Sequence, residues 1–581
     1  MAIEEKEYKT TTSVDRSTEA EIEDDDGDHS SISSLSTDSQ SSSDEIQSIH
    51  QSLSRNAGLE EGLDKGGLAA ITTVTTNMTT DPRFEVDFEG ADNPQEWDMK
   101  RKSVIIFFMS FSTLVVVMYS TSYTAGIPGM MRSFGIHEKT PVVLGVTLYL
   151  FGLALGSIVL APLSEIYGRR PVYLIAVFCF LVLIIPCALA KDLATILVVR
   201  FFGAIAGSAM ISNAPGTVSD IIQEEWRALA FSIWSIGPMN GPVVGPIVGG
   251  FVFQYMGWRW TNWVVMIGSG VAWGMVWLVP ETYAPAILRA KSAKKRKETG
   301  EDRWYSRYDE KKAFWPMLKE NLIRPVAMGV KEPICIFWNV YIALVYALLY
   351  LCFVSYPIVF SELRGWSPGM TGLAYCGIGV GGAITVCCEP LIRRFINSHA
   401  PDPSTGKPPP ESMISIVCIA AFLCPIGEMI FAWTCTPNVH WIAPIIAGIP
   451  FGAGNNAIFI YGSNYLIHSY GIYAASALAG NAVLRSVVGG VLPLAGPQMY
   501  ATLGPHWSGT MLSLIEFAIV PIPLVFYRYG HKIRSKSALI RRMREDREKL
   551  EARLKKAAER EQRAKAREGT IGGDEKKEME V

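Results

Sequence analysis

Two acidic residues each stand four positions before a pair of arginines. The two groups are Glu165 with Arg169 and Arg170, and Glu389 with Arg393 and Arg394. An acid beside arginines at a helix end can form charge-assisted hydrogen bonds that hold two helices together, and their loss releases the helices. The repeated spacing, at corresponding places along the chain, predicts a duplicated architecture whose two halves rock about a central site.

Three ionisable residues inside apolar runs are candidates for a function. They are Arg200, Glu428 and Glu516. An ionisable side chain is costly in hydrocarbon and indicates a function by default. We expect Arg200 to face a proton-bearing carboxylate or a polar cavity, the alternative being a side chain that extends to the outer interface. Glu428 and Glu516 are candidates for proton coupling, with a role in pairing helices as the alternative.

Polar amides and aromatic rings inside other runs are candidates for a substrate cavity. The amides are Asn213, Asn240, Asn455, Asn456 and Asn481, and the aromatic residues with helical spacing are Tyr346, Tyr350, Phe353 and Phe360. A buried amide needs a partner, so these side chains either connect helices or line water. The aromatic residues either line the pathway or form packing contacts.

Long apolar runs must position these residues. Of the 581 residues, 49% are hydrophobic and 19% charged, with a mean hydropathy of +0.21. Each run of about 20 apolar residues is long enough to span a bilayer, where it must be helical. The runs cover residues 103–125, 141–164, 171–190, 193–214, 229–256, 260–281, 333–360, 368–392, 412–433, 440–466, 472–500 and 508–528. The sequence thus predicts an all-α membrane protein with twelve transmembrane helices in two halves of six.

Charge is concentrated outside these runs. We expect an acidic, Ser-rich, disordered cytoplasmic tail (1–100), a first half (101–282), a cytoplasmic central loop (283–332), a second half (333–530) and a charged cytoplasmic tail (531–581). The N-terminal tail is either a phosphorylated regulatory segment or a solvated one. It has no apolar segment typical of a cleaved signal peptide, so the first span is expected to direct insertion.

Loop cations indicate the orientation. With the N-terminus inside, the inner loops carry Arg169, Arg170, Arg227, Arg393, Arg394, Lys407 and the basic central block, whereas the outer loops carry scattered single cations. Cytoplasmic loops are enriched in Lys and Arg. Both termini and the central loop are therefore expected in the cytoplasm.

One string resembles a known family signature. The sequence from Ala161 to Pro171, APLSEIYGRRP, resembles the loop 2–3 motif of the major facilitator superfamily, in the version of its fungal drug:proton antiporters with twelve spans. The resemblance implies a gating motif of Glu165, Gly168, Arg169 and Arg170. The sequence departs from the usual motif at Ala161, at Glu165 and at Ile166, which replaces an Arg.

Further strings strengthen the resemblance. Three Gly-Pro pairs spaced by four (Gly237, Pro238, Gly241, Pro242, Gly245 and Pro246) resemble the antiporter motif found mainly in exporters. Residues 200–207, RFFGAIAG, resemble the embedded-arginine motif. Residues 280–285, PETYAP, and 484–486, LRS, resemble segments of fungal polyamine and multidrug exporters. The resemblance extends over about residues 92–536.

The resemblance implies a proton-coupled antiporter that exports small hydrophobic or cationic compounds, such as drugs, fungicides, toxins or polyamines, by alternating access. Importers or uniporters of a small solute and non-transporting membrane sensors are the alternatives. The sequence contains no GxxxxGK[ST] loop, paired-cysteine spacing or catalytic triad, so we expect no enzyme, metal or cofactor. The net charge of -2 gives no case for nucleic-acid binding. The expected partners are the substrate, protons and the bilayer, for a monomer in the plasma membrane or, alternatively, the vacuolar membrane.

Overall fold

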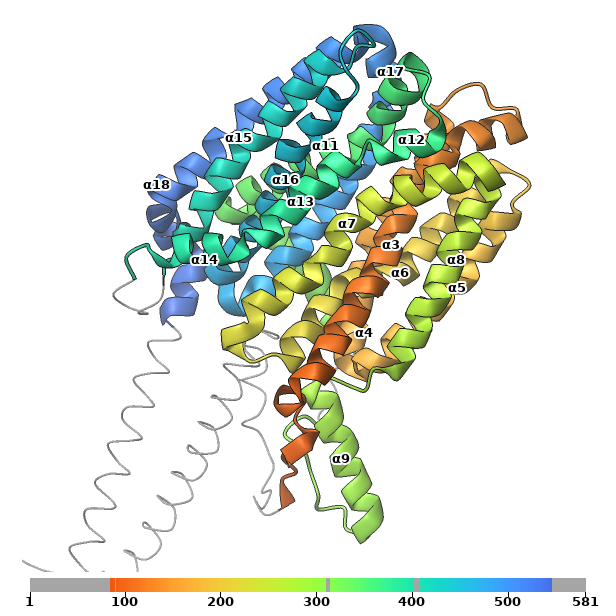
Figure 1. Cartoon of the computed structure of the whole chain (residues 1–581). Coiled ribbons are helices and arrows are strands. Elements are labelled where there is room, and N and C mark those ends of the chain that lie inside the picture. Colours follow the sequence, from red (N-terminus) through yellow and green to blue (C-terminus); the bar gives the residue numbers. More distant parts are fainter. Residues whose placement is uncertain (1–83, 89, 310–313, 402–407, 546–581) are drawn as a thin grey trace, which may run out of the picture. The chain divides into compact units, whose positions relative to one another are not determined.

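The computed structural model describes residues 84–88, 90–309, 314–401 and 408–545 (Figure 1). Most of the predicted N-terminal tail, Lys407 and the C-terminal tail beyond residue 545 therefore lie outside the described residues. The expectations about disorder and phosphorylation fall on those segments.

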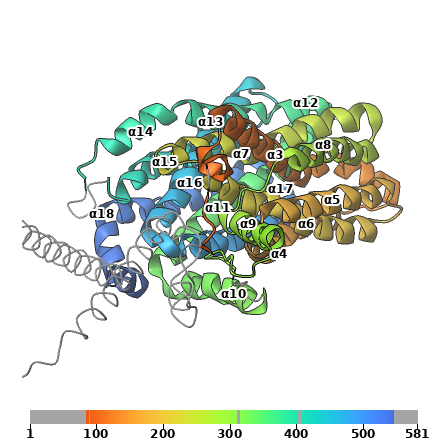
Figure 2. The ribbon, with the colours of Figure 1, turned by 90° about the horizontal axis from the view of Figure 1, so that it is seen from below.

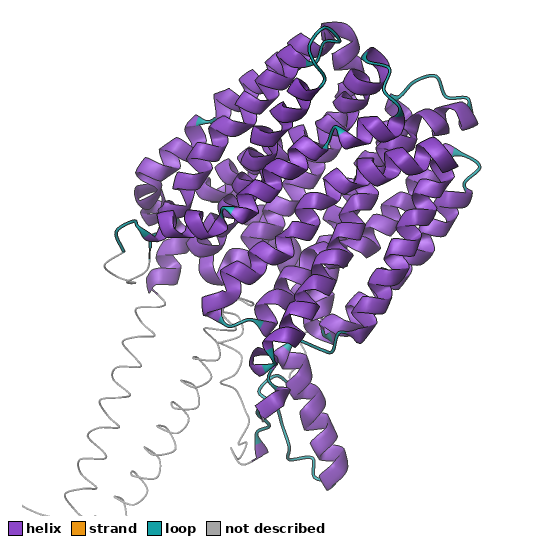
Figure 3. Cartoon of the chain, in the orientation of Figure 1, coloured by secondary structure: helices purple, strands orange, loops and turns teal. Residues whose placement is uncertain are grey.

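Helices account for nearly all of the described chain (Figure 3). The membrane part consists of α3 (Met99–Phe134), α4 (Thr140–Tyr167), α5 (Arg169–Leu189), α6 (Leu193–Ile221), α7 (Glu224–Met256), α8 (Trp258–Leu278), α11 (Pro333–Tyr356) with the π-helical η4 (Pro357–Leu363), α12 (Pro368–Leu373), α13 (Cys376–Cys387), α15 (Glu411–Thr434), α16 (Ile442–Tyr470), α17 (Ala474–Ile519) and α18 (Pro521–Lys536). Shorter elements connect or precede them: η2 (Gly90–Asp92), η3 (Pro94–Glu96), α9 (Ala284–Thr299), α10 (Phe314–Lys331), α14 (Glu389–Asn397) and η5 (Gly471–Tyr473).

Twelve spans result from these helices, as the sequence predicted. Eleven segments of the described chain are long and apolar enough to cross a membrane, and the last of them, Ser476–Lys536, contains two spans. The two meet at Gly504, whose φ of 71° and ψ of 166° break α17. Only glycine adopts this conformation readily, so Gly504 reverses the chain between spans eleven and twelve.

The spans form two groups of six. In the first group α3 packs on α7, α4 on α6 and α5 on α8; in the second, α15 packs on α16, α11 on α17 and α13 on α16. The groups meet where α7 contacts α12 and α13 and where α4 contacts α17. Figure 2 shows α5, α6 and α8 on one side and α15 and α18 on the other. We call the end where Met99 and Tyr167 lie the tail end, and the end where Phe134 and Leu363 lie the opposite end.

The central spans are more deeply buried than the outer spans, as expected for two packed groups of helices. The most apolar part of the span built from α11 and η4 is 78% buried, whereas that of α8 is 33% buried. Large apolar side chains such as Ile175, Ile267 and Trp277 are exposed on the outer helices. Such surfaces suit hydrocarbon rather than water. The second half therefore contributes α11 to the centre, and α8 lies at the lipid-facing edge.

The two halves have the same turn between their last two spans, but their acid–arginine groups differ in structure. Gly257 joins spans five and six with φ 86° and ψ 168°, close to the angles of Gly504 between spans eleven and twelve. The acid–arginine groups do not match in this way. Glu389 begins the separate helix α14 and accepts hydrogen bonds from Arg393 on the same helix (2.7 Å). Arg169 instead begins a new span after Gly168.

The end of the predicted N-terminal tail pairs with the central loop. The Val86 amide donates to the Tyr305 carbonyl (2.9 Å), and the Tyr305 amide donates to Phe84 (3.1 Å). Lys291 of α9 pairs with Asp92 (2.9 Å). Residues 84–88 and 90–98 therefore form a small assembly with the central loop, so the predicted tail (1–100) extends too far into the folded part of the chain.

Candidate functional site

The gating motif forms a buried ion pair at the tail end. Arg169, 5% exposed, approaches Asp220 of α6 with Nε 3.4 Å from a carboxylate oxygen, and donates from an Nη to the Ser164 hydroxyl (2.6 Å). A buried charge is tolerated only when it is paired and hydrogen-bonded. Asp220 was not among the predicted residues, because its pairing with Arg169 arises only when spans two, three and four come together.

One carboxylate connects the two motifs that the sequence showed separately. Glu281, from the PETYAP string after α8, accepts hydrogen bonds from the backbone amides of Arg169 (2.9 Å) and Arg170 (3.1 Å), and from Thr282 and Tyr283 in its own loop (3.0 Å each). The Glu281 carboxylate therefore caps the N-terminus of α5. The first amides of a helix have no partner within the helix, and the helix dipole favours a negative charge at this end.

Space at this junction is tight. Gly168 has a φ of 101°, and a Cβ there would lie 2.5 Å from a Glu281 carboxylate oxygen. Arg169 also lies over the Tyr283 ring (5.2 Å). Burial raises the pKa of Tyr283, and the Glu165 carboxylate raises it further. The phenol therefore remains neutral beside the arginine.

We expect Glu281→Gln to loosen this junction. The amide side chain keeps an acceptor oxygen but loses the negative charge that four N–H groups share, and hydrogen bonds to charged groups contribute about 1.5–3 kcal/mol each. The melting temperature of the purified protein should fall by several degrees, while Glu298→Gln on the exposed face of α9 should leave it unchanged. Equal melting of the two variants would contradict the capping role.

The antiporter motif packs one line of glycines against α3. A Cβ on Gly237 would lie 2.1 Å from the Ser110 carbonyl oxygen, and a Cβ on Gly249 would lie 2.7 Å from that of Ser122. Pro238 lacks an amide proton, so the Trp234 carbonyl loses its helical donor. The Ser110 hydroxyl donates to that carbonyl (2.9 Å) and accepts from the Gly237 amide (3.0 Å). Prolines and glycines thus join spans one and five.

The same helix joins the two halves toward the opposite end. A Cβ on Gly250 of α7 would lie 2.4 Å from the Pro368 carbonyl of α12, and one on Gly372 would lie 2.4 Å from the Pro246 carbonyl. Lys139 forms an ion pair with Glu362 across the halves. The cavity that remains between α3, α7, α11 and α12 at this level is only about 90 Å³. The two halves are therefore in close contact at the opposite end.

Arg200 is enclosed by the first half. It is 1% exposed, and its guanidinium donates to the carbonyls of Gly145 and Tyr119 (3.1 Å each). The rings of Tyr119, Tyr123 and Tyr149 lie 4.2–4.9 Å from it. The side chain does not extend to an interface, and the described residues place carbonyls and aromatic rings around it rather than the expected carboxylate.

The two intramembrane acids lie together in the second half. Glu428 of α15 and Glu516 of α17 are 6% and 2% exposed and act electrostatically on each other. Glu428 faces Gly509 of α17, where a Cβ would lie 3.6 Å from its Oε1. Neither Glu516 oxygen has a hydrogen-bond partner among the described residues.

Four of the five predicted amides connect helices. Asn213 donates to the Leu160 carbonyl, Asn455 to Val345, Asn456 to Gly382 and Asn481 to the Asn339 side chain, at 2.9–3.3 Å. Each crosses from one span to another and is buried. Asn240 instead donates to the Ile236 carbonyl of its own helix and is partly exposed.

The predicted aromatic residues of α11 and η4 fall into a buried group and a group at the boundary between the halves. Phe353 and Phe360 are buried, and Phe353 stacks on Tyr375. Tyr346 is partly exposed, and its hydroxyl is 3.3 Å from that of Tyr350. The Tyr350 hydroxyl lies 3.0 Å from that of Ser120 in the first half. Tyr346 and Tyr350 thus lie at the boundary between the halves.

Arg485 of α17 lies in the LRS segment (484–486) but was not among the predicted site residues. Its guanidinium lies 5.3 Å from the Tyr346 ring and 4.7 Å from the Phe459 ring. An arginine in the middle of an apolar run was itself the available signal. The central boundary therefore contains a cation as well as tyrosines.

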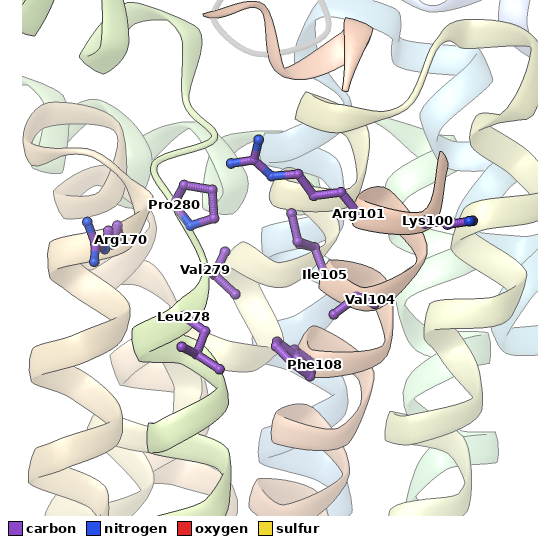
Figure 4. Close-up of a pocket in the computed structure, with 9 residues that line it drawn as sticks. All are labelled: Lys100, Arg101, Val104, Ile105, Phe108, Arg170, Leu278, Val279 and Pro280. Atoms are coloured by element: carbon purple, nitrogen blue, oxygen red, sulfur yellow. The ribbon is translucent and has the colours of Figure 1, made fainter. Parts of the chain in front are cut away.

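A separate hollow of about 490 Å³ lies at the tail end of the first half (Figure 4). Arg101 of α3 extends toward Pro280 above it, and Arg170 borders it on α5, while Val104, Phe108 and other apolar side chains form its inner wall. All of its lining comes from α3, α5 and the end of α8. A compound that passes between the halves would not cross it.

Comparison with known proteins agrees with this architecture. The family model of the Major Facilitator Superfamily matches residues 109–493. The chain is 38% identical over 450 residues to the MFS-type efflux pump MFS2 of Trichophyton rubrum, covering 76% of this chain and 75% of that protein. It is 36% identical over 490 residues to the major facilitator superfamily multidrug transporter mdrA of Aspergillus fumigatus, covering 83% and 78%.

The fold is also that of solved transporters. The proton:xylose symporter XylE superposes with a TM-score of 0.55 at 14% identity, covering 74% of this chain and 96% of that chain. The twelve spans, the embedded charges and the sequence relatives describe a multi-pass membrane transporter rather than an enzyme. The chain belongs to the major facilitator superfamily.

Proposed function

We propose that this transporter is a proton-coupled antiporter that exports small, largely hydrophobic compounds across the plasma membrane. The observation that carries the proposal is the close packing of α7, through its Gly-Pro pairs, on α3 and on α12. This packing closes the opposite end while a partly accessible polar centre remains between the halves. The names of the relatives, efflux pump and multidrug transporter, support export.

The loop charges support an orientation with both termini in the cytoplasm. Lys291 and Lys294 of α9 and Arg534 of α18 lie at the tail end, as the positive-inside rule requires for a cytoplasmic face. In that orientation the described conformation is closed toward the outside. The Lys139–Glu362 pair, with both side chains substantially exposed, is a weak contact that can break when the outer side opens.

Glu428 is the proposed proton carrier, with Glu516 as its neighbour. Two acids that share an apolar site interact strongly, so the charge of one controls protonation of the other. They lie between α11, α15 and α17, and α11 and α17 also carry the central Tyr346 and Arg485. A change in protonation can therefore alter the packing of helices that border the substrate site.

We expect Glu428→Gln to uncouple transport from the proton gradient. Gradient-driven efflux should fall about tenfold or more, since the variant carries no exchangeable proton at this position. Exchange of labelled for unlabelled substrate, which needs no net proton movement, should persist. Glu298→Gln is the matched control on the exposed cytoplasmic face. Loss of exchange together with efflux would argue for a structural role instead.

Efflux from yeast that lacks its main drug pumps tests the function. The chain should lower the accumulation of several compounds in a fluorescent or radiolabelled panel, and a protonophore should abolish that effect. Accumulation that rises with expression would favour an importer or uniporter. Unchanged accumulation across the panel, with the protein located in the membrane, would favour a non-transporting sensor and overturn the proposal.

A further inference from the structure

The second half holds a cation, Arg485, beside which the described residues place no counter-charge. The Nε of Arg485 is buried without a hydrogen-bond partner in the described part of the chain. The titratable groups that act on its charge are Tyr346 and Tyr350, and no carboxylate is among them. Other recessed arginines are treated differently, since Arg169 pairs with Asp220 and Arg534 with Glu411.

Arg485 also differs from the other embedded arginine. Arg200 is sealed and donates to two carbonyls, although its Nη1 has no partner among the described residues. Arg485 is partly accessible although it lies inside the bundle, as are Tyr346 and Phe459, the two rings beside it. An accessible guanidinium between aromatic rings presents free N–H donors beside apolar walls.

This position lies where the halves meet. A Cβ on Gly489, one turn beyond Arg485, would lie 2.9 Å from the Tyr346 ring and 3.8 Å from Leu150 of α4. Tyr350 reaches Ser120 of α3 from the same face of α11. A compound bound at Arg485 would therefore contact both halves, which is the requirement for a site that alternates between two faces.

A cation held in apolar surroundings is costly until an anion pairs with it. The intramembrane acids do not supply this anion. Glu428 and Glu516 interact electrostatically with each other and with cysteines of the second half. From this geometry we infer that Arg485 is a substrate-binding residue, and that the preferred substrates are organic anions with one carboxylate on an aromatic or apolar body. The inference rests on the proposed function for its biological meaning, and it narrows the expected hydrophobic or cationic compounds to hydrophobic ones of negative charge.

Binding to the purified full chain in lipid nanodiscs tests this inference independently of export. Isothermal titration calorimetry would compare carboxylic acids with their primary amides and amines on the same phenyl, naphthyl and indole bodies, near neutral pH. The acids should bind about tenfold more tightly than the amides, and the amines most weakly, as expected for a charge-assisted contact. Equal binding of the three classes, or a preference for amines, would overturn the inference.

Variants of Arg485 test whether this residue causes the preference for acids over amides. Arg485→Gln should remove the advantage of acids over amides, Arg485→Lys should retain most of it, and Arg132→Gln at the exposed opposite end should have no effect. Thermal melting would establish that each variant is folded. A preference that survives in Arg485→Gln would assign the anion site elsewhere and overturn the inference. Failure of proton-coupled efflux with intact acid binding would overturn only the proposed function.

Discussion

Gly237→Ala is expected to leave little folded transporter in the membrane. The added Cβ would lie 2.1 Å from the Ser110 carbonyl oxygen, and a backbone atom of α3 can move only if the whole helix moves. The change would also disturb the Ser110 hydroxyl, which serves both the Trp234 carbonyl and the Gly237 amide. Overpacking of this kind costs about 3 kcal/mol or more, a large share of the stability of a domain.

Gly274→Ala is a matched control. It lies in the interior of α8, and a Cβ there would meet no atom within 4 Å. Because alanine favours a helix over glycine by about 1 kcal/mol, this variant should be as stable as the parent or slightly more stable. Fluorescence-detection size-exclusion chromatography and melting in detergent would compare the two. Similar behaviour of both variants would contradict the close approach of spans one and five.

Removal of Arg200 should have the second largest effect. Arg200→Ala loses two hydrogen bonds and contacts with three tyrosine rings, and it leaves a cavity in a region that is otherwise closely packed. Deletion of a large buried side chain costs about 3–5 kcal/mol. We expect the folded yield and melting temperature to fall sharply, with Arg200→Lys intermediate because it keeps the charge but not the planar fork.

Substitution of Arg485 is expected to affect stability much less than substitution of Arg200. The Arg485 Nε has no hydrogen-bond partner among the described residues, so Arg485→Gln should leave the melting temperature unchanged or raise it. Side-by-side melting of Arg200→Gln and Arg485→Gln would therefore separate an arginine that stabilises the fold from one that is available to a ligand. A larger loss of stability in Arg485→Gln would reverse these assignments.

Features that depend on one helix could be predicted from the sequence. The twelve spans follow from the lengths of the apolar runs, although only the conformation of Gly504 separates the last two. The line of glycines from Gly237 to Gly249 followed from their spacing, because residues four apart share a helix face. The identity of the facing helix, α3, did not, since any span could have supplied it.

Features that depend on several helices could not be predicted in this way. Arg169 forms an ion pair with Asp220 of another span, whereas Arg393 pairs with Glu389 of its own helix at the same spacing. The reason is local: Gly168 turns the chain before Arg169, while Glu389 to Arg393 remain in one helix. Identical spacing thus gave two different contacts, and the gating role of Glu165, Gly168, Arg169 and Arg170 remains a prediction.

The roles of the polar residues at the centre could not be predicted either, because they too depend on contacts between helices. An asparagine in an apolar run has the same sequence signature whether it connects helices or lines a cavity. Asn213 and Asn481 connect helices, and only the packed structure identifies their partners. Arg485 carried an adequate signal on its own, because a single intramembrane cation is rare enough to suggest a function.

Transport into inside-out plasma-membrane vesicles tests the central proposal of proton-coupled export most directly. Vesicles from yeast that expresses the chain would be loaded with acidic buffer and diluted into neutral buffer containing a labelled compound identified by whole-cell efflux. The account predicts uptake that requires the pH gradient, disappears with a protonophore and is lost in Glu428→Gln. Uptake of equal rate without the gradient, or undiminished in Glu428→Gln, would contradict it.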